Sequence, residues 1–252
     1  TADAQKAAVT SQIGQPLEKR TDFGRICLGA ALLSAISGMV NAVAIIEMSS
    51  TVAHHTGNAS HFGRLFGSDG ARFLGLMAAY LVGAGTAGFK EFDGNAVFCD
   101  KSSEGLLGVA GAIATGAGLQ GIFGLKSLAL LSLSFSQGLQ NGITSRFSGL
   151  ALRTTHMTGA LTDAGLILGQ WVQAQYLGKE PPSLRKPKLF LLCLLSFAAG
   201  GFVANLLRKV LGTLAALVPA ALLAVVASGR FTITEIEEVL LKNVAMIKAK
   251  VA

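Results

Sequence analysis

The sequence predicts an all-α membrane protein: a polytopic bundle of six transmembrane helices with two shorter or broken helices. Its composition is the first reason, since 51% of the residues are apolar, 14% are charged and the mean hydropathy is +0.55. A soluble domain carries about 25% charged residues, so this composition excludes an ordinary soluble enzyme. The charges are also segregated: from residue 105 to 178 the acids and bases are Lys126, Arg146, Arg153, His156 and Asp163. The third reason is an internal repeat.

Six segments are long and apolar enough to cross a bilayer, which takes about 20 residues. They are residues 26–46, 71–89, 105–123, 127–145, 189–207 and 211–228. Two more segments are ambiguous, because residues 58–66 are too few and residues 158–177 contain Asp163 and three glutamines. We expect these two to form half-helices or tilted spans that face protein.

The repeat is marked by a motif in each half of the chain. His-His-Thr-Gly-Asn at residues 54–58 returns as His-Met-Thr-Gly-Ala at residues 156–160, and Gly-Met-Val-Asn-Ala at 38–42 returns as Gly-Leu-Gln-Asn-Gly at 138–142. We therefore divide the chain into an extended N-terminal tail (1–23), a membrane domain (24–228) and a C-terminal amphipathic helix (229–252). Within the membrane domain, the first copy covers about 24–123 and the second about 125–228.

These motifs resemble the YoaK-like integral membrane proteins, a domain of unknown function usually described as having six spans. The most specific stretch is Arg-Thr-Thr-His-Met-Thr-Gly-Ala-Leu-Thr-Asp at residues 153–163, and the resemblance covers about residues 24–228. It implies a transporter-like bundle without an established activity. Similar proteins commonly have Asp where Asn41 stands and Met where His55 stands.

The topology and the location follow from the charges and the chain start. The shortness of residues 58–66 favours three crossings per half, which would invert the second copy relative to the first. The tails and the loop with Lys179, Arg185, Lys186 and Lys188 then share the positive, cytoplasm-like side. The sequence begins at Thr1 without Met, and its first 20 residues have no apolar signal core. This favours an organellar membrane, reached after removal of a targeting peptide.

The repeated Thr-Gly pairs are the first candidate site. Thr56 and Thr158 are placed to cap free helical amides, and Gly57 and Gly159 permit close backbone approach. Two helix starts that point to the midplane would present their dipoles to an anionic or polar solute. The alternative is that these residues only cap and pack two interfacial helices.

Ionisable and amide side chains complete the expected site. Asp163 lies in an otherwise uncharged stretch, and an acid within a membrane is a functional candidate. Its repeat counterpart is His61. Together with His54 and His156, these two residues could form a site that binds a proton or a cation during transport. The alternative is that Asp163 pairs with a nearby arginine, such as Arg153, or bonds to backbone. The amides of Asn41, Asn141, Gln137 and Gln140 either join helices or line a polar pathway.

Small residues recur every four positions in two of the expected spans. Such spacing lets helix backbones approach closely in lipid, so we assign these residues to helix packing. They are Gly75, Ala79, Gly83, Ala87, Gly108, Ala112 and Gly116.

The motifs of enzymes are missing from the sequence, which has neither a Ser-His-Asp arrangement, nor a phosphate loop, nor a paired carboxylate site. We therefore expect a non-enzyme without metal or evident cofactor, although the histidines could ligate a lipid or a pigment.

The expected partners are the lipid bilayer and other membrane subunits bound through the two tails, not nucleic acid. The leading function is binding or moving a small polar solute or ion. The alternative is an accessory scaffold subunit of a large plastid or mitochondrial membrane complex.

Overall fold

The computed structural model describes residues 17–21, 23–65, 67–90, 100–147 and 153–228, and these residues form helices and turns without a strand. In chain order the elements are η1 (Leu17–Lys19), α2 (Phe23–Met48), α3 (His55–Arg64), α4 (Ser68–Phe89), α5 (Asp100–Gly121), α6 (Lys126–Phe147), α7 (Met157–Tyr176), α8 (Arg185–Leu211), η2 (Gly212–Ala216) and α9 (Leu217–Ala227). The all-α class predicted from the sequence is therefore confirmed. The two ambiguous segments became α3, with 10 residues, and α7, with 20.

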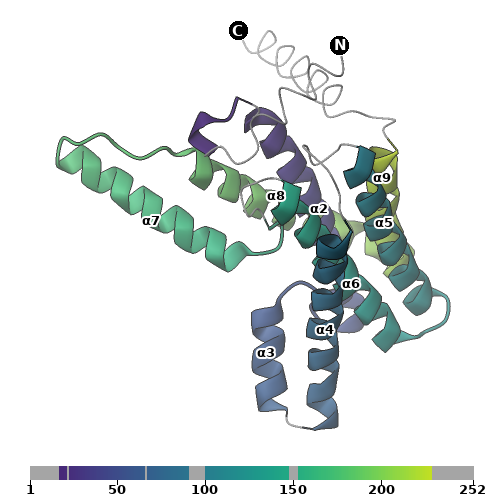
Figure 1. The fold of residues 1–252 in the computed structure, drawn as a ribbon. Coiled ribbons are helices and arrows are strands. Elements are labelled where there is room, and N and C mark those ends of the chain that lie inside the picture. The colour runs from purple at the N-terminus through teal and green to yellow at the C-terminus, as the bar shows by residue number, and fades with distance from the viewer. Residues whose placement is uncertain (1–16, 22, 66, 91–99, 148–152, 229–252) are drawn as a thin grey trace.

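The helices pack as partners that are distant in sequence (Figure 1). Helix α2 lies along α8, and α4 lies along α6; α5 packs on α6 and α9. The core between them is aliphatic, with Leu33, Val40, Ile113, Leu133 and Leu223 fully buried. Helix α3 packs on α4 and α7 on α8; Figure 1 shows α3 and the adjoining part of α4 reaching downward, and α7 reaching to the left, away from the centre.

Glycines make the two long helix pairs possible. A β-carbon on Gly38 would collide with the carbonyl oxygen of Phe197, and one on Gly200 with that of Ala35, so α2 and α8 touch backbone to backbone. The α4–α6 pair has the same construction. There, a β-carbon on Gly138 would collide with the Tyr80 carbonyl oxygen, and one on Gly83 with that of Phe135.

Within the described residues, three segments are long and apolar enough to cross a membrane: Phe23–Met48, Gly70–Phe89 and Arg185–Ala227. They cover four of the six expected spans, because the last segment holds 189–207 and all but the final residue of 211–228. The other two expected spans form α5 and α6, which are helical but are not among the three apolar segments found in the described residues. Six spans are therefore not confirmed, whereas a membrane environment is supported.

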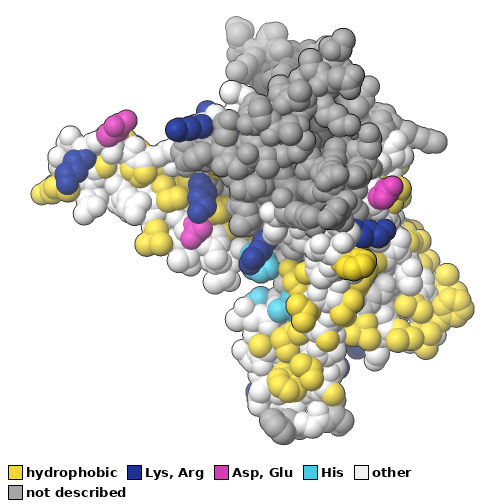
Figure 2. Space-filling model, viewed as in Figure 1, with side chains coloured by type: hydrophobic (Ala, Val, Ile, Leu, Met, Phe, Trp, Pro, Cys, Tyr) yellow, Lys and Arg dark blue, Asp and Glu magenta, His cyan; other side chains and the backbone are white. Residues whose placement is uncertain are grey.

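Large apolar side chains on the outside agree with a lipid environment. Leu81, Val82, Phe89, Ile122 and Phe123 are each at least 60% exposed. Figure 2 shows hydrophobic side chains gathered over the lower part of the molecule, around α4 and α5, where charged side chains are few. A monomer in water rarely exposes so much contiguous apolar surface, so the bilayer is the environment that this face fits.

The end of the expected N-terminal tail is held by α8. Arg185 donates hydrogen bonds from Nη1 to the carbonyl oxygens of Leu17 (3.2 Å) and Arg20 (2.9 Å), and Leu17 is buried. Residues 1–16 and the expected amphipathic helix 229–252 lie outside the described residues.

Candidate functional site

Helices α3 and α7 begin at matching positions of the repeated motif. The residues that precede them are His54 (φ −104°, ψ 75°) and His156 (φ −91°, ψ 65°). The expected capping by Thr56 and Thr158 is wrong: both lie inside the first turn, and neither helix start has a side-chain cap in the described structure. Instead, the carbonyl oxygen of Thr56 accepts a hydrogen bond from the hydroxyl of Ser60 (3.1 Å), and the carbonyl oxygen of Thr158 accepts one from the hydroxyl of Thr162 (3.1 Å).

The starts of α3 and α7 are coupled electrostatically through His55. Burial lowers the pKa of His55 to about 4, and the charges of His156 and His54 are smaller causes of the same shift. The ring of His55 contacts that of Tyr80 on α4, with centroids 4.3 Å apart. Partial burial, followed by the charge of Arg153, also lowers the pKa of His156. Both imidazoles are therefore neutral at physiological pH, when they can accept as well as donate a hydrogen bond.

A buried polar network joins α2, α6 and the turn before α7. Gln140 Nε2 donates to the carbonyl oxygen of Leu33 (3.0 Å), to Ser37 Oγ (2.9 Å) and to Thr154 Oγ1 (3.0 Å). The hydroxyl of Thr154 donates in turn to Asn141 Oδ1 (3.2 Å). Gln140, Ser37 and Thr154 are fully buried, so these bonds form in a medium of low dielectric, where they are strong.

Asn41 and Asn141 have equivalent tasks in the two halves. Asn41 Oδ1 accepts from the backbone N–H of Val52 (3.1 Å), two residues before His54. Asn141 Oδ1 accepts from Thr154, two residues before His156, and its Nδ2 donates to Thr155 Oγ1 (2.8 Å). Each asparagine thus fixes the turn that leads into α3 or α7. The sequence left open whether the amides join helices or line a pathway, and for the two asparagines these contacts favour the first role.

Three buried polar atoms near this network have no hydrogen-bond partner among the described residues. They are both amide atoms of Gln137, which is fully buried, and Gln140 Oε1. Gln137 and Gln140 stand three residues apart on α6, so they share one helix face. A fourth such atom is His55 Nε2. Asn58 Nδ2 is an N–H donor, as its bond to the carbonyl oxygen of Thr51 shows. In the bond between Asn58 Nδ2 and His55 Nδ1 (3.3 Å), His55 Nδ1 is therefore the acceptor, and the proton of the His55 ring is on Nε2.

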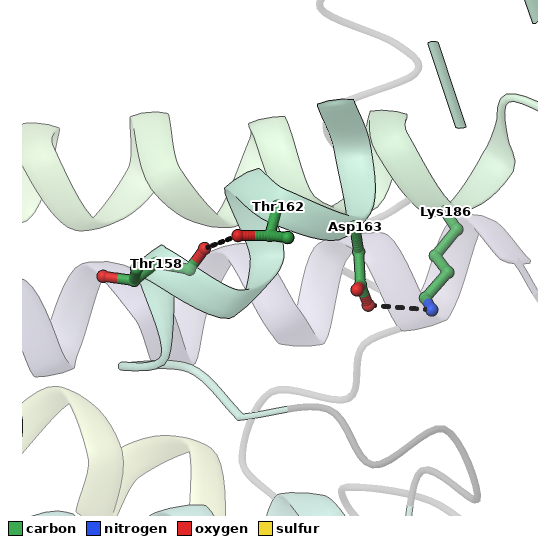
Figure 3. A network of polar contacts seen from close by, with 4 residues as sticks. All are labelled: Thr158, Thr162, Asp163 and Lys186. Carbon is green, nitrogen blue, oxygen red and sulfur yellow. Dashed lines mark hydrogen bonds and ion pairs between the residues drawn. The ribbon is translucent and has the colours of Figure 1, made fainter. Parts of the chain in front are cut away.

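Asp163 lies away from this network. Its carboxylate pairs with Lys186 of α8 at 3.0 Å, and both side chains are more than 40% exposed (Figure 3). The partner suggested from the sequence, Arg153, is therefore not the one found in the described structure. His61 lies on α3 and stacks on Phe73, with ring centroids 4.9 Å apart. Asp163 and His61 therefore have separate partners, and their helices, α7 and α3, extend in different directions in Figure 1.

The remaining predicted residues fall into two groups. A β-carbon on Gly57 would meet the His54 ring at 2.7 Å, whereas Gly159 has open space around it among the described residues. The small residues of α4 and α5 face α6, where a β-carbon on Gly83 would collide with the Phe135 carbonyl oxygen and one on Gly116 would meet Leu133 at 2.7 Å. Their placement agrees with the packing role expected for them.

Several residues here were not predicted as site residues, although three of them lie in the motifs quoted from the sequence (His55, Thr154 and Thr155); the other two are Ser37 and Tyr80. One signal could have found Ser37. Leu-Ser at residues 33–34 returns at 133–134, which extends the repeat upstream of Gly38 and Gly138 and aligns Ser37 with Gln137. Tyr80 had no such signal, because it reaches the site only through the packing of α4 on α6, where its ring contacts that of His55.

Comparison with known proteins gives a family but no activity. A family model described as a protein of unknown function (DUF1275) matches residues 29–229. No curated protein and no solved structure matches the chain.

Proposed function

The chain belongs to the DUF1275 family of YoaK-like membrane proteins, and from this premise we propose that it binds or moves a small polar solute between α2 and α6. The observation that carries the proposal is Gln137, whose amide is fully buried and unpartnered among the described residues. Burying an amide without a hydrogen bond costs about 1–3 kcal/mol. A solute that pairs with this amide would recover that free energy.

The chemistry of the site indicates what kind of solute fits. An amide offers two N–H donors and a carbonyl acceptor, and Gln140 Oε1 adds a second free acceptor. The side chains that form the network with them, Ser37, Thr154 and Asn141, are neutral. Recognition would therefore rest on hydrogen bonds to a solute that both donates and accepts. Asp163 and His61 are left outside this site, because the first pairs with Lys186 and the second stacks on Phe73.

The proposed architecture is six spans built from an inverted repeat, with α2 opening the first half and α6 the second. Reciprocal packing supports the repeat. Gly38 of α2 lies against Phe197 of α8, while the equivalent Gly138 of α6 lies against Tyr80 of α4. Each half thus lends its first helix to the other half. A site between α2 and α6 would then lie where the two halves meet, as in transporters built from repeats.

An accessory subunit of a larger membrane complex is the second candidate, and α7 favours it. This 20-residue helix packs on α8, yet Leu166 and Val172 remain 61% and 60% exposed. An apolar helix that reaches away from its bundle is suited to a neighbouring subunit as well as to lipid. An accessory subunit needs no catalytic activity. This role therefore agrees with our proposal that the protein is not an enzyme and needs no cofactor.

Uptake into proteoliposomes would test the leading proposal. The full chain is reconstituted and supplied with labelled small polar solutes, such as amides, polyols and amino acids. We expect uptake or exchange of at least one class, lost in Gln137→Leu and retained in the control Gln170→Leu, since Gln170 is exposed on α7. Copurification of the protein from its native membrane with a large complex, with no solute moved by any preparation, would favour the accessory role instead.

A further inference from the structure

A polar pocket of about 240 Å³ lies where α2 ends. The turn after α2, helix α3 and the first turns of α4 form its walls, with Ser50, Thr51, Asn58, His61, Arg64 and Arg72 among the lining residues. A water molecule takes about 30 Å³ of liquid volume, so the pocket can hold a tetrahedral oxyanion and several waters. It is separate from the Gln137 site, so a ligand could bind here whether or not that site recognises a solute.

The two charged side chains among the lining residues, apart from the ring of His61, are both cations. Arg64 comes from the last turn of α3 and Arg72 from the start of α4, while the described lining residues include no carboxylate. Glu47, the acid near the end of α2, pairs with Arg208 at 3.6 Å instead. Arginine's planar fork of donors matches the oxygens of a phosphate group. The pocket therefore favours an anion over a cation or an apolar ligand.

An aromatic ring holds two of these side chains in place. Phe73 is 4% exposed, the guanidinium of Arg72 lies 4.5 Å from its ring centroid, and the His61 ring stacks on it at 4.9 Å with 16° between the planes. The opposite wall is fixed too, because Thr51 Oγ1 donates to Asn58 Oδ1 (3.2 Å). Donors held in advance by their neighbours lose less conformational entropy when they bind a ligand.

A buried hydroxyl in the lining points independently to a ligand. Ser50 is 7% exposed, and its Oγ has no hydrogen-bond partner among the described residues. Buried polar groups are nearly always hydrogen-bonded in proteins, and an exception calls for an explanation such as a bound ion or water. An oxyanion would supply the acceptor that this hydroxyl lacks.

We propose that this pocket binds a phosphate group through Arg64, Arg72 and the hydroxyl of Ser50. Free phosphate and the headgroup of a phospholipid offer the same chemistry. The pocket opens at the end of Phe23–Met48, one of the three apolar segments, and headgroups lie at the ends of such segments in a bilayer. Both sources are therefore tested.

The test uses the full chain in neutral detergent, with two arms. In the first, thermal unfolding is followed against inorganic phosphate, with potassium chloride at matched ionic strength as the reference. In the second, the chain is incubated with mixed micelles that carry labelled phosphatidylglycerol or labelled diacylglycerol, which lacks the phosphate, and the lipid retained after purification is counted. The variants are Arg64→Gln and Ser50→Ala, and the control is Lys126→Gln, an exposed cation at the start of α6.

We expect saturable binding in at least one arm, weakened at least tenfold in Arg64→Gln and unchanged in Lys126→Gln. Ser50→Ala removes only a buried, unpartnered hydroxyl, so it should fold normally and still weaken binding; it decides the outcome if Arg64→Gln proves unstable. A response to phosphate identifies the free anion, and selective retention of phosphatidylglycerol identifies the headgroup. Absence of binding in both arms, or equal binding by the parent, Arg64→Gln and Ser50→Ala, would overturn the proposal.

Discussion

Two glutamines one helical turn apart on α6 have opposite roles in the folded state. Gln140 donates to Leu33, Ser37 and Thr154, whereas both amide atoms of Gln137 lack a partner among the described residues. A buried hydrogen bond stabilises a protein by about 1 kcal/mol, but a buried polar group without a partner costs about 1–3 kcal/mol. The same substitution should therefore change stability in opposite directions at the two positions.

Replacing each glutamine by leucine tests this contrast. Without solute, Gln137→Leu should raise the free energy of unfolding by about 1–2 kcal/mol, because the amide is lost without breaking a bond. Gln140→Leu should lower it by about 2–4 kcal/mol, because the buried hydrogen bonds that its amide shares among Leu33, Ser37 and Thr154 are lost. Denaturant unfolding in detergent measures both. Equal destabilisation by the two variants would mean that Gln137 is satisfied in the folded protein and that the proposed site is filled by the protein itself.

The neutral imidazole of His55 makes stability depend on pH. Its pKa is lowered to about 4 by burial and by the charges of His156 and His54, while a histidine in the unfolded chain titrates near 6.5. Between about pH 6.5 and 4 the unfolded state therefore binds a proton that the folded state does not, and the stability falls as the pH falls. Because the ring is partly exposed and solvent screens it, we expect a loss of about 1–2 kcal/mol.

Unfolding midpoints measured from pH 7 to pH 4 would show this effect. His55→Gln should lose part of this acid dependence and keep the part that comes from His156, whose pKa burial also lowers, whereas His61→Gln, at an exposed position, should keep the slope of the parent. If His55→Gln follows the parent throughout this range, burial of a neutral His55 is not the cause.

At the scale of elements, the fold depends on two helix pairs in which backbones touch. The small-residue spacing predicted this contact surface on α4, because a run of Gly and Ala every four positions in a span has few other uses. The sequence did not reveal which helix would lie against it, since the partner α6 is joined to α4 only through α5. The spacing therefore indicated a contact face and left the partner open.

Alanine substitutions on α4 would test this packing. Gly83→Ala should destabilise the protein by about 2–3 kcal/mol or more, because the new β-carbon collides with the carbonyl oxygen of Phe135. Gly85→Ala, on the same helix with open space among the described residues, should stabilise it by about 0.5–1 kcal/mol through helix propensity. The measurement is thermal unfolding of both variants. Similar midpoints would show that α4 and α6 do not pack as closely as the structure has them.

The α7–α8 ion pair is expected to contribute little. Asp163 and Lys186 are 45% and 42% exposed, and exposed pairs are worth about 0–1 kcal/mol. Asp163→Asn should therefore change the unfolding free energy by less than about 1 kcal/mol and leave solute uptake intact. A complete loss of uptake in this variant would restore Asp163 to the site, as the sequence alone suggested.

For the whole molecule, the first helix of each half packs on a helix of the other half, so the two halves should depend on each other to fold. Helix α2 packs on α8 and α6 on α4, so neither half can bury its first helix alone. When residues 1–124 and 125–252 are produced as separate chains, we expect each to aggregate by itself and the two to copurify when made together. Size-exclusion chromatography in detergent checks this. A stable, monodisperse first half would show that the halves are independent.

How much the sequence predicted differs between the fold and the site. The all-α class, most helix boundaries and the matching starts of α3 and α7 followed from hydropathy and the repeated motif, because both are local properties. The site followed less well. Asp163 stood out as an isolated acid, but Lys186, which is 23 residues further along the chain, approaches it only once α7 folds back on α8. The buried network depends on contacts between α2 and α6 that local patterns do not encode.

Accessibility of position 137 to a water-soluble reagent tests the central claim most directly. In a background in which Cys27, Cys99 and Cys193 are replaced, Gln137→Cys and the fully buried control Ile143→Cys on the same helix are exposed to a small, membrane-impermeant thiol reagent. A polar pathway between α2 and α6 predicts labelling at 137, slowed by the solute that the protein recognises, and none at 143. Equal protection of both positions, with and without every solute tested, would contradict it.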